Sequence, residues 1–109
     1  IKKQVIYLAL ALLLAGCATS HPAAEMTVNE IKQKYPDIKE EWAWDIKRGR
    51  VAIGMNKQMV IDALGRPNDI NTTKTANYKR EQWVYQDGAY GYDAQYIYFD
   101  NGKVDSIQN

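Results

Sequence analysis

Residues that carry out covalent or metal chemistry are scarce in this sequence. Its 109 residues include one cysteine, Cys17, and one histidine, His21. There is no second cysteine for an internal disulfide and no pair of histidine or cysteine residues at metal-ligand spacing. A Gly-x-Ser-x-Gly nucleophile turn and a Gly-x-x-x-x-Gly-Lys phosphate loop are also missing. We therefore expect no metal, no catalytic residue and no enzymatic activity.

Excess charge is small as well. The chain has 14 basic and 13 acidic side chains, a formal net charge of +1. Lys2 and Lys3 belong to the N-terminal segment, and without them 12 basic side chains face 13 acidic ones, a net charge of −1. Nucleic-acid binding depends on a basic field that neutralises phosphates. Nucleic acid is therefore not an expected partner.

No apolar run is long enough to cross a bilayer. The clearest one, Val5 to Leu14, carries no charge and follows Lys2 and Lys3. As a helix it would rise roughly 15 Å, against about 30 Å for the hydrocarbon core of a bilayer. A basic start followed by a short apolar run is typical of a secretion signal. Residues 1–16 are therefore predicted to be a signal peptide.

The end of this segment, Leu14-Ala15-Gly16-Cys17, resembles the lipobox of bacterial lipoproteins. The resemblance implies cleavage between Gly16 and Cys17, a thioether from the Cys17 sulfur to diacylglycerol, and an N-acyl chain on the new amino group. Two or more chains anchor a protein stably in a membrane. Ala18 is not the aspartate that resembles an inner-membrane retention signal. We expect a lipid-anchored, periplasm-facing protein of the outer membrane, in a Gram-negative host.

The remaining chain is long enough for one domain. Residues 17–26 are small and polar without periodicity, which predicts a lipidated flexible tether with His21 as a solvated linker residue. Residues 27–109 are expected to form a single domain, because a chain of this length supports one small core. The division is thus a signal peptide, a tether and one domain.

The first half of that domain is predicted to be helical. Thr27 and Glu30 have the spacing of a capping box, which predicts a helix to about Lys34. Pro36 interrupts the pattern, so a second helix is expected from Pro36 or Asp37 to Arg48, ending at Gly49. Apolar residues recur at steps of three or four through both segments: Val28, Ile31, Tyr35, Ile38, Trp42 and Ile46.

A third helix is predicted over residues 57–64. Asn56 is a good N-cap, and Gly65 can supply a left-handed C-terminal cap before Pro67. The apolar residues expected to share one face of this helix are Met59, Val60, Ala63 and Leu64.

The second half reads as strands over residues 69–73, 81–86, 94–100 and 103–107. Asn101-Gly102 between the last two is a strong hairpin signal, because both residues tolerate positive φ. Helices followed by strands, without alternation, predict a two-layer α+β domain. In it the N-terminal helices pack on a three- to four-stranded antiparallel β-meander.

The sequence also resembles a known family. The matching segments are Ile53–Pro67, with Gly-Met-x-x-x-x-Val-x-x-x-Leu-Gly-x-Pro, then Glu81–Tyr85 and Tyr98–Val104. They resemble the SmpA/OmlA, or BamE-like, family of outer-membrane lipoproteins, whose fold is similar to repeats of β-lactamase inhibitor protein. The resemblance spans about residues 50 to 107 and implies the same α+β architecture. It also implies a role in outer-membrane protein assembly or envelope integrity.

Aromatic residues are the candidates for partner binding. The chain has eight tyrosines and three tryptophans but one phenylalanine. Tyr90 and Tyr92 lie in a glycine-containing segment between two predicted strands, where they either contact a partner or fold back over the sheet edge. Trp44 is a second candidate, for a partner or a membrane interface, because residues two apart on a helix diverge and Trp42 is on the apolar stripe. Trp83 is expected in the core.

These features predict a membrane-anchored, non-enzymatic protein-interaction module of the bacterial envelope. It would have no cofactor apart from the covalent lipid on Cys17. Two alternatives stay open, an inhibitor of a periplasmic or extracellular hydrolase and a lipid-binding lipoprotein. Tight binding to a purified hydrolase would favour the first, and a closed apolar cavity between sheet and helices the second.

Overall fold

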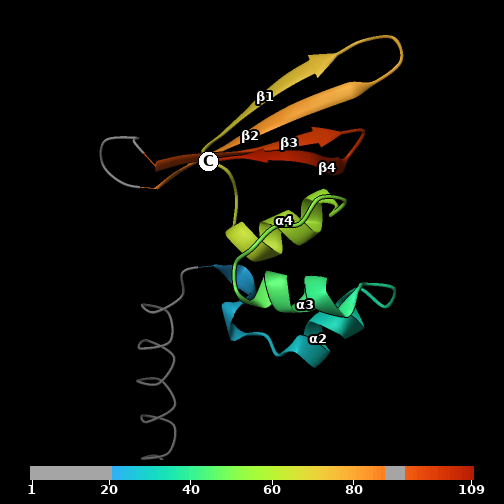
Figure 1. The fold of residues 1–109 in the computed structure, drawn as a ribbon, viewed down its shortest axis with the longest axis vertical. Helices are drawn as coiled ribbons and strands as arrows, with labels where there is room; N and C mark the ends of the chain where they lie inside the picture. Colours follow the sequence, from blue (N-terminus) through green and yellow to red (C-terminus); the bar gives the residue numbers. More distant parts are fainter. Residues whose placement is uncertain (1–20, 88–92) are drawn as a thin grey trace, which may run out of the picture.

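The helical segments come first in the chain and form a layer on one face of an antiparallel sheet (Figure 1). The computed structural model describes residues 21–87 and 93–109. A 3₁₀ turn, η1 (Pro22–Glu25), precedes the helices α2 (Val28–Lys34), α3 (Glu40–Lys47) and α4 (Lys57–Leu64). The strands are β1 (Asp69–Lys74), β2 (Lys79–Asp87), β3 (Asp93–Asp100) and β4 (Lys103–Gln108). The predicted α+β class, with helices packed on a β-meander, is confirmed.

The four strands pair in the order in which they occur along the chain. Asn101 and Gly102 form the turn between β3 and β4 with φ values of 50° and 85°, as their sequence predicts. The outer edge of β4 is partly covered, because the Val104 amide donates to the Met55 carbonyl at 2.8 Å and the Gly54 amide to the Val104 carbonyl at 2.9 Å. The outer edge of β1 is the opposite border of the sheet, and all six β1 residues are exposed.

The core lies between the sheet and the helices. Strand alternation turns Trp83, Ile97 and Phe99 toward the helical layer, where each is almost completely buried. The rings of Trp83 and Phe99 are 4.5 Å apart and tilted by 52°. The core residues from the helical half are Ala23, Ile31, Ala43, Ile46, Met55, Met59, Val60 and Ala63. The predicted core position of Trp83 is confirmed.

The helix caps follow the sequence closely at α2 and α4. The Glu30 amide donates to the Thr27 hydroxyl at 3.1 Å, and the Thr27 amide donates to the Glu30 carboxylate at 3.1 Å. At α4 the Met59 amide donates to Asn56 Oδ1 at 2.9 Å. Gly65 ends α4 with φ 84° and ψ −170°, so it is extended rather than helical, in a region of positive φ that favours glycine. The prediction of a left-handed cap there holds for φ but is wrong for ψ.

The second helix starts later than predicted. Residues 36 and 37 form a turn, and α3 begins at Glu40 rather than at Pro36 or Asp37. Tyr35, directly before the proline, has φ −127° and ψ 83°, outside the helical region, and proline disfavours the helical conformation of the residue before it. The Ile38 amide then donates to the Tyr35 carbonyl at 3.0 Å, closing the turn.

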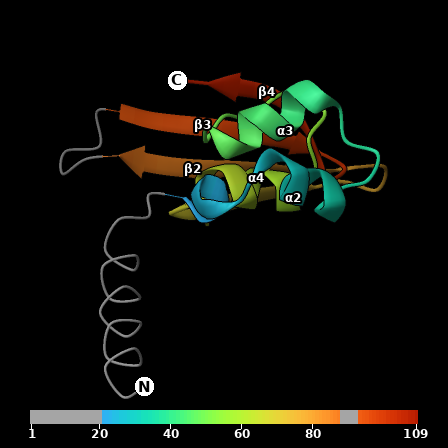
Figure 2. The same ribbon diagram turned by 90° about the horizontal axis from the view of Figure 1, so that it is seen from below.

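The tether expected over residues 17–26 does not extend to residue 26. Ala23 in η1 is completely buried, and His21 Nε2 lies 2.9 Å from the Lys47 carbonyl oxygen. The Lys47 ammonium donates to the carbonyl oxygens of Ala24 at 3.3 Å and Met26 at 2.8 Å. Figure 2 shows η1 beside the helices. Residues 21–26 therefore belong to the folded domain, and His21 is a packed residue rather than a solvated linker residue.

Candidate protein-interaction surface

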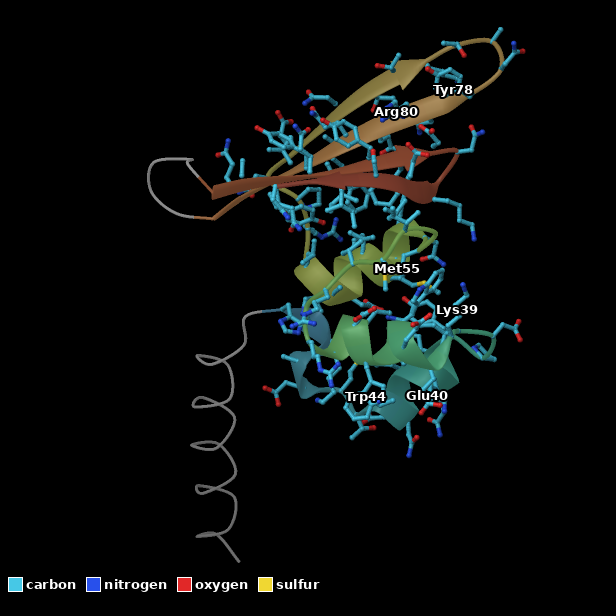
Figure 3. All side chains as sticks on the ribbon, in the orientation of Figure 1. Lys39, Glu40, Trp44, Met55, Tyr78 and Arg80 are labelled. Atoms are coloured by element: carbon cyan, nitrogen blue, oxygen red, sulfur yellow. The ribbon has the colours of Figure 1, made fainter. Side chains whose placement is uncertain are left out.

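The sheet has one face without helices. Alternation places Tyr96 and Tyr98 of β3 opposite to the buried Ile97 and Phe99, and places Arg80 and Gln82 of β2 on the same side as the two tyrosines. In Figure 3, Arg80 lies on the side of the sheet away from the helices. We call this side the open face.

A chain of side-chain hydrogen bonds crosses the open face from β1 to β4. The Asn71 amide donates to Gln82 Oε1 at 2.9 Å, and Gln82 Nε2 donates to the Tyr98 hydroxyl oxygen at 3.0 Å. The Tyr98 hydroxyl in turn donates to Gln108 Oε1 at 3.1 Å. Because every strand contributes one member, the chain holds these four side chains in fixed positions across the sheet.

Arg80 lies above the centre of this chain. Its guanidinium donates to Asp100 at 2.8 Å and lies 3.6 Å from Asp105. The guanidinium carbon is 5.0 Å from the centre of the Tyr98 ring, within the range of a cation–π interaction. Val84, on the same face and outside the core, is only 8% exposed, so neighbouring side chains cover it. We call Asn71, Arg80, Gln82, Tyr98, Asp100 and Gln108 the open-face cluster.

The open-face cluster is suited to recognition. It combines an aromatic ring, a guanidinium and amide groups, which can donate and accept hydrogen bonds. Tyrosine and arginine are enriched among the residues that dominate protein interfaces. Internal hydrogen bonds already restrict these side chains, so less side-chain entropy would be lost when a partner binds to them.

The β1–β2 hairpin extends this surface. Tyr78 in its turn is 42% exposed. Ile70 on β1 is also exposed, but it pairs with the buried Trp83 and therefore lies on the helix-facing side of the sheet. In the turn, the Thr75 hydroxyl accepts from the Tyr78 amide at 3.1 Å, and the Thr75 amide donates to the Tyr78 carbonyl at 2.9 Å. One large aromatic side chain is thus exposed at the end of the hairpin that carries Arg80 and Gln82.

Two buried carboxylates were not singled out from the sequence. Asp62 of α4 is 5% exposed and accepts from the Tyr35 hydroxyl at 2.6 Å, from Lys34 at 2.8 Å and from Gln58 at 3.1 Å. Burial raises the pKa of Asp62, but these three hydrogen bonds together outweigh it and hold the pKa below its ordinary value. Burial also raises the pKa of Tyr35, as does its bond to the carboxylate. Asp62 therefore ties the end of α2 to α4.

Glu81 of β2 is the second buried carboxylate, and it connects the sheet to α4. It is 7% exposed, and its carboxylate contacts the Lys57 ammonium, the Trp83 indole N–H at 3.1 Å and the Lys79 ammonium at 3.5 Å. Burial opposes ionisation, yet these partners lower the pKa of Glu81. The sequence could have indicated the burial of Glu81, because residues two apart on a strand share a face and Glu81 therefore lies on the same core face of β2 as Trp83 and Tyr85. Asp62 thus connects two helices within the helical layer, and Glu81 connects the helical layer to the sheet.

Trp44 lies on the opposite side of the molecule from the open face (Figure 3). It is 42% exposed on α3, and the guanidinium carbon of Arg48 is 5.1 Å from the centre of its ring. Trp42 is packed against the core, so the predicted divergence of the two tryptophans is confirmed. Trp44 and the open-face cluster cannot form one site.

The other predicted site residues, Gly16, Cys17, Tyr90 and Tyr92, lie outside the described residues. Within residues 21–87 and 93–109 there is no group of three or more histidine, cysteine or acidic residues placed to hold a metal ion. In the same two ranges no helix has the length and apolar character needed to cross a membrane.

Comparisons of the chain with protein-family models, with curated proteins and with solved structures found no match.

Proposed function

We propose that this protein is a bacterial envelope lipoprotein that binds a protein partner through the open face of its sheet. The anchor part is supported by the order of Lys2 and Lys3, the apolar run to Leu14, and Gly16-Cys17. In this proposal Cys17 carries the diacylglycerol and the N-acyl chain, and the domain faces the periplasm from the outer membrane. The SmpA/OmlA resemblance of residues 50–107 supports a role in outer-membrane protein assembly or envelope integrity.

The single observation that carries the binding part is the open-face cluster. Arg80 and Tyr98 are stacked, and hydrogen bonds to Asp100, Gln82 and Gln108 orient both. The two buried carboxylates face the helices instead and have a structural explanation. A rigid surface of arginine, tyrosine and amide groups favours binding over catalysis.

Site-specific photocrosslinking in intact cells tests this proposal. A photoreactive amino acid replaces Asn71 or Ser106, which lie on β1 and β4 on either side of the Gln82–Tyr98 pair. The matched control position is Gln33, which is exposed on α2 in the other layer. We expect both sheet positions, but not Gln33, to capture the same envelope protein.

Arg80→Ala in the Ser106 background then removes the guanidinium beside Tyr98 without altering the probe. Loss of a central interface arginine costs at least about 2 kcal/mol, roughly a 30-fold weaker complex, so the adduct should nearly disappear. Capture of an assembly subunit would support the assembly role, and capture of a hydrolase would replace it with inhibition. Equal adducts at Gln33, or adducts that persist in Arg80→Ala, would overturn the open face as the binding surface.

A further inference from the structure

The folded domain includes residues that are very close to the proposed lipid along the chain. His21 is four residues after Cys17, and it already contacts the helical layer through the Lys47 carbonyl oxygen. Four extended residues span at most about 14 Å. If Cys17 is lipidated, the surface around His21 must therefore lie near the lipid headgroups.

Three arginines surround this part of the domain. A Cβ atom on Gly49 would lie 3.2 Å from the His21 ring, and Arg48 and Arg50 flank this glycine. A Cβ atom on Gly65 would lie 3.9 Å from the Pro22 ring, and Arg66 follows that glycine. The ends of α3 and α4 thus bring their arginines to residues 21 and 22. We call Arg48, Arg50 and Arg66 the anchor-side arginines.

The anchor-side arginines are exposed, and no ion pair among residues 21–87 and 93–109 includes any of them. Arg48 only stacks on the ring of Trp44. The neighbouring Lys47 adds a fourth positive charge, since its ammonium donates to carbonyl oxygens and not to an acid. The acidic residues on η1 and the last turn of α3 are Glu25 and Asp45, and Glu30 of α2 interacts electrostatically with Lys47, so three acidic side chains face four basic ones. Positive charge is therefore in excess around His21, although the domain as a whole is slightly acidic.

From this charge and the short distance to Cys17 we propose that the anchor-side arginines dock the domain on the anionic headgroups of the bilayer that holds its lipid. The inference rests on the proposed lipidation of Cys17. Guanidinium groups bind phosphate well, and Trp44 under Arg48 adds a side chain suited to the headgroup region. The open-face cluster lies in the other layer of the fold, so docking leaves it uncovered for a partner (Figure 3).

The test uses the mature protein with its lipid, reconstituted into two kinds of vesicle. One is phosphatidylcholine alone, and the other is an equimolar mixture of phosphatidylcholine and phosphatidylglycerol. Because Cys17 is the single cysteine, Glu25→Cys on η1 or Thr73→Cys on β1 gives one site for a fluorophore. Quenching by a nitroxide on the lipid headgroup reports how close each label is to the surface. Because the link to Cys17 is short, we expect stronger quenching at residue 25 than at residue 73 in both vesicle types. Docking should make this difference clearly larger in the anionic vesicles.

The variant that probes docking is Arg48→Gln, Arg50→Gln and Arg66→Gln together. Each basic residue near an anionic surface favours the docked state about fivefold. The triple variant should therefore lower the ratio of docked to undocked protein roughly 100-fold. The matched control, Lys32→Gln, Lys74→Gln and Lys103→Gln, removes the same charge from α2, β1 and β4 and should leave quenching unchanged. Unfolding curves of both triple variants check that neither has lost the fold.

The outcomes separate the anchor from the docking. The intact mass and vesicle incorporation report the lipid, and the label reports orientation. A protein that stays in the vesicles but gives equal quenching in both vesicle types, or responds alike to both triple variants, overturns docking and leaves the anchor intact. Stronger quenching at residue 73 overturns the proposed orientation. A protein with unmodified Cys17 that does not enter vesicles overturns the proposed function, and docking with it.

Discussion

At the residue scale, two buried carboxylates connect neighbouring elements of the fold. Asp62 and Glu81 are each almost completely buried and each has three partners. An acidic residue at such a position is stabilising only while it is ionised and hydrogen-bonded. The position of Asp62 between Met59 and Ala63, which the sequence places on the apolar side of α4, could have indicated its burial. Its partners could not be predicted, because Lys34 and Tyr35 come from another helix.

The depressed pKa of Asp62 predicts a dependence of stability on pH. A carboxyl group whose pKa is lowered by folding stabilises the protein above its unfolded pKa, and this contribution is lost as the pH falls through the folded pKa. Stability should therefore fall below about pH 5. Asp62→Asn should cost about 1–3 kcal/mol at neutral pH and should flatten the acid side of the curve.

Urea unfolding at a series of pH values measures this effect. Asp37→Asn is the control, because Asp37 is exposed in the turn after α2. It should shift the free energy of unfolding by no more than about 0.5 kcal/mol. A curve for Asp62→Asn that runs parallel to that of the unmodified protein would show that Asp62 does not contribute in this way.

At the element scale, the sequence predicts helix caps and turns correctly but does not predict the packing of segments that are distant in the chain. Thr27, Asn56 and Asn101-Gly102 act within a few residues of themselves, so their capping and turn roles could be predicted. Residues 21–26 have no periodicity, yet η1 is held by the ends of α3 and α4. A side chain at Gly49 would approach the His21 ring to 3.2 Å, whereas one at Gly65 would make only an ordinary contact with Pro22 at 3.9 Å. The sequence of residues 21–26 alone does not indicate that this segment contacts the ends of α3 and α4.

The packing of η1 predicts that Ala23 is sensitive to size and charge. Ala23→Asp would place a carboxylate in the completely buried position of this side chain. We expect a loss of at least about 2 kcal/mol in the free energy of unfolding, because the carboxylate would be buried in the apolar core cluster that contains Ala23. Ala24→Asp, at the less buried neighbouring position of η1, is the control and should cost clearly less. Equal stability of both variants and the unmodified protein would mean that residues 21–26 behave as a tether after all.

At the scale of the whole molecule, the two layers have different proposed tasks. The helical layer carries residues 21–26, the anchor-side arginines and Trp44. The sheet carries the open-face cluster on its other side. The two-layer class and strand order could be predicted from the element pattern. The open-face cluster could not, since it depends on the register that places Gln82 opposite both Asn71 and Tyr98.

Both tasks depend on the lipid, because docking and access to an envelope partner require that the domain be held at a membrane. The most direct test of this claim is mass spectrometry of the N-terminal peptide from protein extracted from cell envelopes. We expect a peptide that begins at Cys17 and carries diacylglycerol on its sulfur and an acyl chain on its amino group. A peptide that retains residues 1–16, or one with an unmodified Cys17 thiol, would contradict this claim.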